Sequence, residues 1–363
     1  MSFTPKSRIQ ATLRGEPVDR VPLSIYGVLF PRGEGERQLR NAGLAVVERV
    51  PLCRVEMPNV ILQSQEYYDQ DILTIRETAR TPVGEVTQTM KLDPSLGTSW
   101  WHQDFFVKRP ADYRVLEFMV RDTIFYPNYD DYLLTQERWG EDGYAMGESS
   151  AGLWSGYSPM GLMMYKLLGV ERFCVDSYDQ PDEFFSLYEA IKVMQRGMFQ
   201  VCALSPADVV CYAGNIHQDT MGPQRFVDYY LPSINEFADV MHEHGKLASC
   251  HYDARMKTLV KAVAESKTDI IEAFTPPPDC DVTVEEARAA WPNKILWVNF
   301  PSSMHLESPE RIRQTTLDIL SEAVSVNRFL MGVTEDIPEY VRCASLNVIL
   351  QTLSEAGALP IQI

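Results

Sequence analysis

Residues 247–274, LASCHYDARMKTLVKAVAESKTDIIEAF, contain a β-rich run, a helical stretch and a second β-rich run. Leu247–His251 and Ile270–Phe274 are the expected strands, and a helix is expected over about Met256–Ser266. Two strands joined by one helical crossover lie parallel in one sheet. The stretch therefore predicts a protein of the α/β class that is built on a parallel sheet.

The same alternation continues on both sides of this stretch. Further strands are expected at Val209–Gly214, Ile295–Phe300 and Phe329–Val333. Helices are expected between them, over about Gly222–His244, from Thr283, from Ser308 to about Val324, and up to Gly357. Thr283 with Glu286 forms a capping box, and Ser308 with Pro309 is a typical helix start. The C-terminal half thus predicts five successive β/α units.

The N-terminal half supplies three more expected strands, Val21–Tyr26, Leu52–Glu56 and Tyr144–Met146. Parallel strands with helical crossovers form either an open sheet or a closed barrel. A total of eight strands favours a (β/α)8 TIM barrel.

A long excursion separates the second and third of these strands. Ile72–Ala79 and Glu85–Leu92 alternate polar and apolar residues around Thr81-Pro82-Val83-Gly84, which predicts an antiparallel hairpin. We expect residues 67–140 to form a flap inserted into a single domain of residues 1–363, because no Gly/Ser/Pro linker or low-complexity tract marks a second domain.

Composition excludes several classes of function. The 363 residues are 45% hydrophobic, and 33 Lys and Arg against 50 Asp and Glu give a net charge of −17, which argues against nucleic acid or an anionic membrane as a partner. No run approaches the ~18 apolar residues of a membrane span, and the start MSFTPKSRIQ lacks the apolar core of a signal peptide. The seven cysteines form no CxxC pair, so we expect reduced thiols and a cytoplasmic protein.

Reacting groups in such barrels come from the carboxyl ends of the strands and from the loops that follow them. Polar residues at these ends are therefore the candidates for the site. They are Tyr26, Glu56, Glu148, Asn215, His217, His251, Asp253, Glu272, Thr275, Asn299 and Glu335.

Two pairs among them have an informative spacing, His251 with Asp253 and, if the strand before them runs that far, Asn215 with His217. Residues i and i+2 of a strand point to the same side, so His251 and Asp253 should point together. Imidazole with carboxylates suits Zn, Fe, Mn or Ni, and Glu335 or Glu272 could be the third ligand. The alternative is that His251 and Asp253 bind each other and the backbone at the rim of the barrel.

Other motifs are absent or point to structure. The sequence has no GxGxxG after a strand, no GxxxxGK[ST], no HExxH and no GxSxG. These absences disfavour nucleotide-dependent enzymes and triad hydrolases. In Glu335-Asp336-Ile337-Pro338, Asp336 is expected to be the N-cap of the last helix.

Several motifs together resemble the uroporphyrinogen decarboxylase superfamily over nearly the whole chain. They are Lys6-Ser7-Arg8 through Leu13-Arg14-Gly15-Glu16-Pro17-Val18-Asp19-Arg20-Val21-Pro22, Thr81-Pro82-Val83-Gly84, Pro223-Gln224-Arg225-Phe226, His244-Gly245-Lys246 leading to His251, and Glu335-Asp336-Ile337-Pro338. The resemblance implies a (β/α)8 barrel with one of two activities: decarboxylation of a porphyrinogen without a cofactor, or zinc-dependent methyl transfer to or from a corrinoid protein.

The two branches require different residues. The decarboxylases use an arginine-rich N-terminal segment to bind substrate carboxylates, whereas residues 25–33 here, IYGVLFPRG, hold one arginine. The methyltransferases bind zinc through H-x-C and a later cysteine. In this sequence His251 is kept, Asp253 replaces the first cysteine and Glu335 lies near the second, which implies a harder and more Lewis-acidic site.

We therefore expect a metal-dependent, methyltransferase-like enzyme that moves a methyl group between a small, methoxylated or similar substrate and a corrinoid protein. The corrinoid would be carried by a separate partner, the metal would be divalent, with zinc implied by the resemblance, and a homodimer is implied as well. Metal ligands would be His251, Asp253 and Glu335, and His217, Glu272 and Glu335 would serve catalysis. Substrate would contact Tyr26, Glu56, Glu148, Asn215, Thr275 and Asn299. The alternatives are a decarboxylase or other lyase acting on a small or porphyrinogen-like acid, and a non-catalytic ligand-binding barrel.

Overall fold

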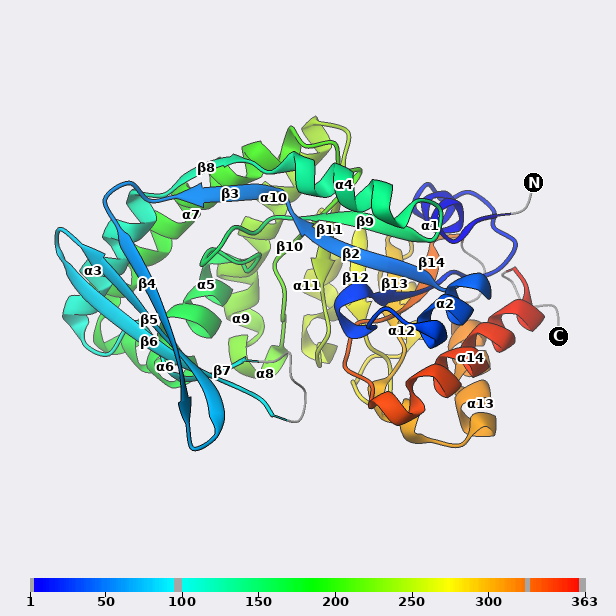
Figure 1. Cartoon of the computed structure of the whole chain (residues 1–363). Coiled ribbons are helices and arrows are strands. Elements are labelled where there is room, and N and C mark those ends of the chain that lie inside the picture. The colour runs from blue at the N-terminus through cyan, green and yellow to red at the C-terminus, as the bar shows by residue number, and fades with distance from the viewer. Residues whose placement is uncertain (1–2, 95–99, 324–326, 359–363) are drawn as a thin grey trace.

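The computed structural model describes residues 3–94, 100–323 and 327–358, and its centre is a closed barrel of parallel strands (Figure 1). Around the barrel the strand order is β1-β14-β13-β12-β11-β10-β9-β2. Their bounds are β1 Leu23–Tyr26, β2 Ala45–Pro51, β9 Gly143–Glu148, β10 Val209–Tyr212, β11 Leu247–His251, β12 Ile270–Phe274, β13 Ile295–Asn299 and β14 Phe329–Val333. This arrangement confirms the predicted (β/α)8 barrel.

The second barrel strand differs from the prediction. The barrel uses β2, Ala45–Pro51, which pairs in parallel with β1 and β9. The predicted strand Leu52–Glu56 is instead β3 (Cys53–Glu56), which pairs antiparallel with β8 (Ile124–Pro127) outside the barrel. The prediction missed β2 because Glu48 and Arg49 interrupt its apolar sequence. A barrel strand that packs on both faces is expected to be a continuous apolar run.

Helices surround the barrel and connect its strands (Figure 1). The longer ones are α1 Pro5–Leu13, α2 Glu34–Asn41, α3 Pro110–Arg121, α4 Tyr129–Trp139, α6 Val170–Asp179, α7 Pro181–Ala203, α10 Leu231–Glu243, α13 Pro309–Glu322 and α14 Glu339–Ala356. Shorter ones are α5 Pro159–Leu162, α8 Gln218–Met221, α9 Pro223–Arg225, α11 Val260–Ala264 and α12 Val284–Ala290. Among the described helices, none is both long and apolar enough to cross a membrane.

Helix ends follow the predicted caps with two exceptions. Thr283 forms its capping box with Glu286 at α12, and the Ser308 side chain accepts from the Arg311 N–H at the start of α13. The expected helix end at Val324 lies outside the described residues. Asp336 is not an N-cap, because α14 begins at Glu339 after Pro338.

The excursion between β2 and β9 holds a four-stranded antiparallel sheet in the order β4-β5-β6-β7. These strands are β4 Ile61–Asp69, β5 Ile72–Thr81, β6 Gly84–Leu92 and β7 Trp100–Asp104. The pairing of β5 with β6 confirms the predicted hairpin. The flap boundaries at 67–140 and the single-domain assignment stay predictions.

The lower part of the barrel interior is apolar. Its cluster holds Ala45, Val47, Tyr144, Met146, Val209, Cys211, Ile270, Ile295, Trp297 and Leu330. Ile9 and Leu13 of α1 join this cluster, so α1 packs across the amino end of the barrel. Trp297 crosses the interior and donates from Nε1 to Ser24 Oγ at 3.1 Å. A Cβ on Gly332 would lie 2.8 Å from that nitrogen, so a residue without a side chain is required there.

A bulge in β12 changes the direction of its side chains. The register against β13 shifts between Glu272 and Phe274, and Ala273 between them has φ +58°. Phe274 consequently packs outward, edge-on against Trp291, with ring centroids 5.8 Å apart. Glu272 keeps its inward position at the carboxyl end of the barrel.

Candidate active site

The upper part of the barrel interior holds a connected chain of polar side chains from five strands. The Tyr26 hydroxyl donates to Glu272, and Glu272 in turn contacts His251. Arg49 donates to the Tyr26 hydroxyl at 3.4 Å and forms an ion pair with Glu148. Because these strands run parallel in one closed barrel, their carboxyl ends bring together residues that are far apart in sequence.

His251 lies at the centre of this chain, with a carboxylate at each ring nitrogen. Nδ1 is 2.5 Å from Glu272 Oε2, and Nε2 is 3.2 Å from Asp253 Oδ2. Burial alone would lower the pKa of His251, but the charges of Glu272 and Asp253 outweigh burial and raise that pKa to about 10. The ring is therefore an imidazolium at neutral pH when nothing else binds it. The sequence placed His251 and Asp253 together correctly.

Glu272 is fully buried beneath His251. Burial would raise its pKa, but the neighbouring charges of His251 and Arg49 lower it, so Glu272 stays ionised. With one oxygen on His251 and the other on Tyr26, this carboxylate fixes the orientation of the imidazole.

Arg49 was not found by sequence reasoning. Its guanidinium pairs with Glu148 and lies 5.7 Å from the centroid of the Tyr26 ring. Glu148 also accepts from Ser150 Oγ at 3.1 Å. The sequence feature that could have revealed Arg49 is the charged pair Glu48-Arg49 within an apolar run. Successive side chains of a strand point to opposite faces, so one of the two must point into the barrel. Glu48 points outward and accepts a hydrogen bond from Trp139 Nε1 at 2.7 Å.

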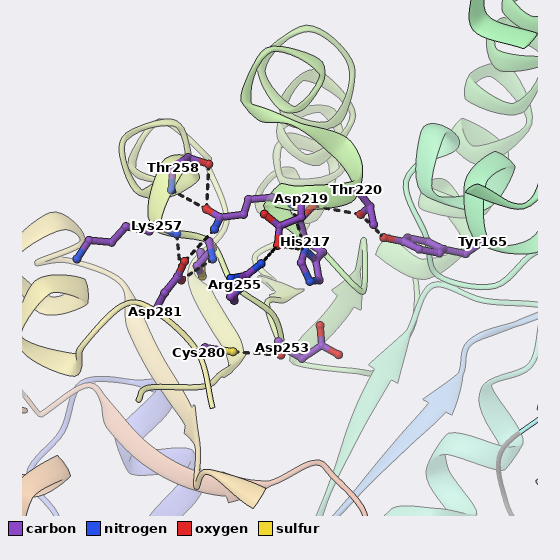
Figure 2. Close-up of polar contacts among 12 residues, drawn as sticks. Tyr165, His217, Asp219, Thr220, Asp253, Arg255, Lys257, Thr258, Cys280 and Asp281 are labelled. Carbon is purple, nitrogen blue, oxygen red and sulfur yellow. Dashed lines mark hydrogen bonds and ion pairs between the residues drawn. The ribbon is translucent and has the colours of Figure 1, made fainter. Parts of the chain in front are cut away.

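The rim above His251 is acidic. Burial and the charge of Asp253 raise the pKa of Glu335, so the two carboxylates lie close enough to interact. Cys280 lies near them, with its Sγ 3.9 Å from the Asp253 carbonyl oxygen, as Figure 2 shows. Burial, with the charges of Asp281 and Asp253, raises the pKa of the Cys280 thiol to about 12. Cys280 is a second residue that sequence reasoning missed, because no motif marks it.

Tyr157 is a third residue that was missed. A Cβ on Gly214 would be 3.9 Å from His251 Cβ and 4.0 Å from Tyr157 Cε1, so the tyrosine ring and His251 flank this glycine. Burial and the charge of Asp253 raise the pKa of the Tyr157 phenol to about 12. The phenol is therefore a neutral donor beside the acidic rim.

His217 has a structural contact at the rim (Figure 2). Its Nδ1 accepts from the Asp219 N–H at 3.1 Å, which caps α8. Asp219 forms an ion pair with Arg255. Within the described residues no hydrogen bond or ion pair joins His217 to the His251 chain, and the predicted catalytic role of His217 stays a prediction.

Asn299 and Thr275 form a separate buried network. Asn299 Nδ2 donates to Thr275 Oγ1 at 3.1 Å, and its Oδ1 accepts from the Thr334 N–H at 2.9 Å. The two side chains thereby join the carboxyl ends of β12, β13 and β14, the last of which leads to Glu335. Their predicted contact with substrate is untested.

Two residues predicted to contact substrate, Glu56 and Asn215, have exposed side chains. Glu56 ends β3, which is outside the barrel, and its side chain is exposed beside Arg54. The prediction that Glu56 ends a barrel strand is wrong, because β3 pairs with β8 outside the barrel, and its predicted contact with substrate stays a prediction. Asn215 follows β10 as expected but is exposed, with φ +54°.

The donor set fits a metal in part. Within residues 3–94, 100–323 and 327–358, no three His, Cys, Asp or Glu side chains form a ready ligand cluster. The 3.2 Å between His251 Nε2 and Asp253 Oδ2, however, is only slightly shorter than the spacing of about 3.3–3.6 Å between two ligands that lie about 2.0–2.2 Å from one tetrahedral ion. A carboxylate on the other nitrogen is the usual support of a metal-binding histidine. Two donors therefore fit as they stand, and the third must approach.

The fold and the site define a TIM-barrel protein with an imidazole–carboxylate centre at the carboxyl end of the strands. Comparison of sequences then assigns the family: the sequence model of the uroporphyrinogen decarboxylase (URO-D) family matches residues 156–355, and the chain belongs to that family. The resemblance predicted from the sequence motifs is thereby confirmed. No match is found among curated proteins.

A solved structure supports the fold. The chain is similar to a structure described as a methyltransferase from Methanosarcina mazei, with 13% identity and a TM-score of 0.56 over 98% of this chain and 99% of that chain. Tandem GH20 catalytic modules of a pneumococcal exo-β-D-N-acetylglucosaminidase give 7% identity and a TM-score of 0.39 over 94% and 86%. The first likeness shows the shared barrel fold.

Proposed function

We propose that this protein is a metal-dependent methyltransferase that moves a methyl group between a small methoxylated substrate and a corrinoid carried by a partner protein. The observation that carries the proposal is the His251 site: Glu272 holds one ring nitrogen, and the other faces Asp253 at 3.2 Å. The similarity in fold to a methyltransferase supports the same branch of the family.

His251 and Asp253 would hold a divalent ion, with zinc as our first choice, and Glu335 would complete the ligand set. The bound ion would supply Lewis acidity to the oxygen that the methyl group leaves. Glu272 keeps the imidazole in position by accepting a hydrogen bond from Nδ1–H. The other nitrogen, Nε2, gives up its proton when the ion binds. Two carboxylates and one imidazole give a harder donor set than thiolates, which suits an ether oxygen better than a thiol.

The first test is elemental analysis of purified wild type, His251→Ala, Asp253→Ala and Glu272→Gln, each checked for folding by circular dichroism. We expect near-stoichiometric metal in wild type, its loss from the first two variants, and an affinity lowered about 10- to 100-fold in Glu272→Gln. His242→Ala is the matched control, since His242 pairs with Asp269 at 2.8 Å outside the barrel. Wild type that stays free of metal in the presence of Zn, Fe, Mn or Ni would contradict the proposal.

The second test separates metal binding from methyl transfer. Metal-loaded protein is mixed with a purified corrinoid protein in its reduced state and with methoxylated donors, and the absorbance of the corrinoid is followed. We expect conversion to the methylated spectrum with wild type and none with His251→Ala. If no donor methylates the corrinoid while metal is bound, methyl transfer should be abandoned.

One observation favours a second function, decarboxylation or another lyase reaction on a small acid. Both nitrogens of His251 contact carboxylates in the described structure, an arrangement that can move protons without a metal. Asp253 or Glu335 would then be the proton donor. Release of CO2 from a candidate acid, without corrinoid and in the presence of a chelator, would support the lyase.

A further inference from the structure

Strand β4 forms a long open edge of the four-stranded sheet. It pairs with β5 on one side, and within the described residues no strand pairs with its other side. Ile61 through Tyr68 are exposed, including Leu62 at 48% and Tyr68 at 73%. Figure 1 shows β4 in blue beside the cyan strands of the same sheet. The open edge is thus nine residues long.

This edge lacks the usual protection against pairing. Its sequence, ILQSQEYYD, contains no proline, glycine or lysine, and its ladder with β5 runs from Ile61 to Asp69 without a shift. The opposite edge, β7, has five residues, and its ladder with β6 shifts near Thr89. A long, regular edge with exposed Leu and Tyr is a surface for another strand.

The turn after β4 fixes which main-chain groups point outward. Gln70 and Asp71 both have positive φ, as in a two-residue type I′ turn, so the flanking pair Asp69–Ile72 is hydrogen-bonded. Hydrogen-bonded and free positions alternate along an antiparallel ladder. The odd-numbered residues of β4 therefore bond to β5. The free N–H and C=O groups belong to Leu62, Ser64, Glu66 and Tyr68.

We propose that β4 pairs antiparallel with β4 of a second copy, which joins two sheets into one continuous sheet across a two-fold axis at Gln65. In this register Leu62 of each copy faces Tyr68 of the other, and Ser64 faces Glu66. All four outward-facing residues of each strand are then used, for about eight main-chain hydrogen bonds. The proposal is independent of the proposed function.

Charge and pairing select this register over its neighbours. Sliding the strands so that Glu66 faces Glu66 sets like charges directly opposite, which is destabilising. Sliding them the other way, to put Ser64 against Ser64, leaves Tyr68 without a partner within β4. The Gln65-centred register avoids both and brings each exposed leucine onto a tyrosine ring.

The mass of the protein in solution is the direct test, measured by sedimentation velocity over a range of concentrations. We expect a dimer for wild type and a monomer for Ser64→Pro, because proline removes an outward N–H and is tolerated on a free edge. Ser64→Ala keeps that N–H and should remain dimeric. A monomeric wild type at tens of micromolar, or a dimeric Ser64→Pro, would overturn the proposal.

Charged substitutions of Ser64 test whether this residue faces Glu66 of the other copy. Ser64→Glu places like charges opposite each other twice per dimer, whereas Ser64→Lys places opposite charges there. We expect the dimer dissociation constant of Ser64→Glu to exceed that of Ser64→Lys by about tenfold or more at low salt. Equal constants would show that Ser64 does not face Glu66.

Disulfide formation tests the register. In a Cys343→Ser background, Gln65→Cys places two cysteines in a directly opposed, non-hydrogen-bonded pair, close enough to join. Gln63→Cys is the matched control, because that residue faces Tyr67 of the other copy. Mild oxidation should give a covalent dimer for Gln65→Cys and not for Gln63→Cys. Cross-linking of the control as readily as of Gln65→Cys would refute the register.

Discussion

The lower and upper halves of the barrel interior are made by the same strands and have opposite characters. The lower half packs Val47, Met146 and Ile270 without a charge, while the upper half holds His251 against Glu272, with Arg49 joined to them through the Tyr26 hydroxyl. Along β12, one step of two residues leads from Ile270 to Glu272. The apolar core and the polar site are therefore separated by a single layer of side chains, so a substitution in the lower layer should change stability and leave the polar site in place.

The largest expected effect comes from emptying the lower layer. Ile270→Ala removes a fully buried side chain and should lower the free energy of unfolding by about 4 kcal/mol, since the closed barrel cannot collapse into the cavity. Urea unfolding measures this loss. Metal content per folded molecule should not change. A loss of metal from folded Ile270→Ala would show that the two layers are not independent.

Removing a charge from the upper layer should cost slightly less. Arg49→Met keeps much of the side-chain volume but leaves Glu148 without its ion-pair partner, and Glu272 keeps only His251 as a nearby cation. We expect a loss of about 3 kcal/mol by urea unfolding, the cost of an unpaired, largely buried carboxylate. The double variant Arg49→Met, Glu148→Gln should recover part of it. An Arg49→Met variant as stable as wild type would mean that water molecules solvate the Glu148 carboxylate well enough without the arginine.

A smaller effect comes from comparing two buried histidines. His305 lies outside the barrel, packed on Phe300 with centroids 5.0 Å apart, and its Nδ1 is 2.6 Å from Ser345 Oγ. Burial lowers its pKa to about 4, whereas carboxylates raise that of His251. The unfolded chain takes up this proton near pH 6.5, before the folded protein does. The stability that His305 contributes is therefore present above pH 6.5 and lost as the pH falls toward 4.

Between pH 7 and pH 5 this difference should amount to about 2 kcal/mol. The measurement is urea unfolding at both values for wild type and for His305→Gln, which has no group that titrates in this range. The pH-dependent loss should be smaller in the variant by that amount. Identical pH dependence would show that His305 is not held neutral.

Sequence patterns predicted the fold better in the C-terminal half than in the N-terminal half. From Val209 onward each strand is short, largely apolar and followed by a helix, so local periodicity and tertiary position agree. In the N-terminal half the excursion interrupts this order, and Leu52–Glu56 has the alternation of a strand but belongs to an outer sheet. Alternation of apolar and polar residues indicates a half-buried strand, but it does not indicate to which sheet that strand belongs.

The candidate site was predicted in part for a related reason. His251 and Asp253 share a strand end, so their proximity follows from local geometry, and Tyr26, Glu148 and Glu272 follow from the barrel rule. Arg49 is contributed by the strand that was misassigned. The bulge at Ala273, which lets Phe274 turn outward, depends on a positive φ in a residue other than glycine, and sequence gives no sign of it.

The position of helix α1 determines how small molecules reach and leave the barrel interior. Its Ile9 and Leu13 close the amino end of the barrel, so small reactants must enter and leave past the acidic rim around Asp253. A large protein that delivers a second reactant would have to sit over that same opening. Such a partner would trap whatever was bound before it and delay the release of product until it left. We therefore expect compulsory order in the kinetics, with the small molecule first in and last out.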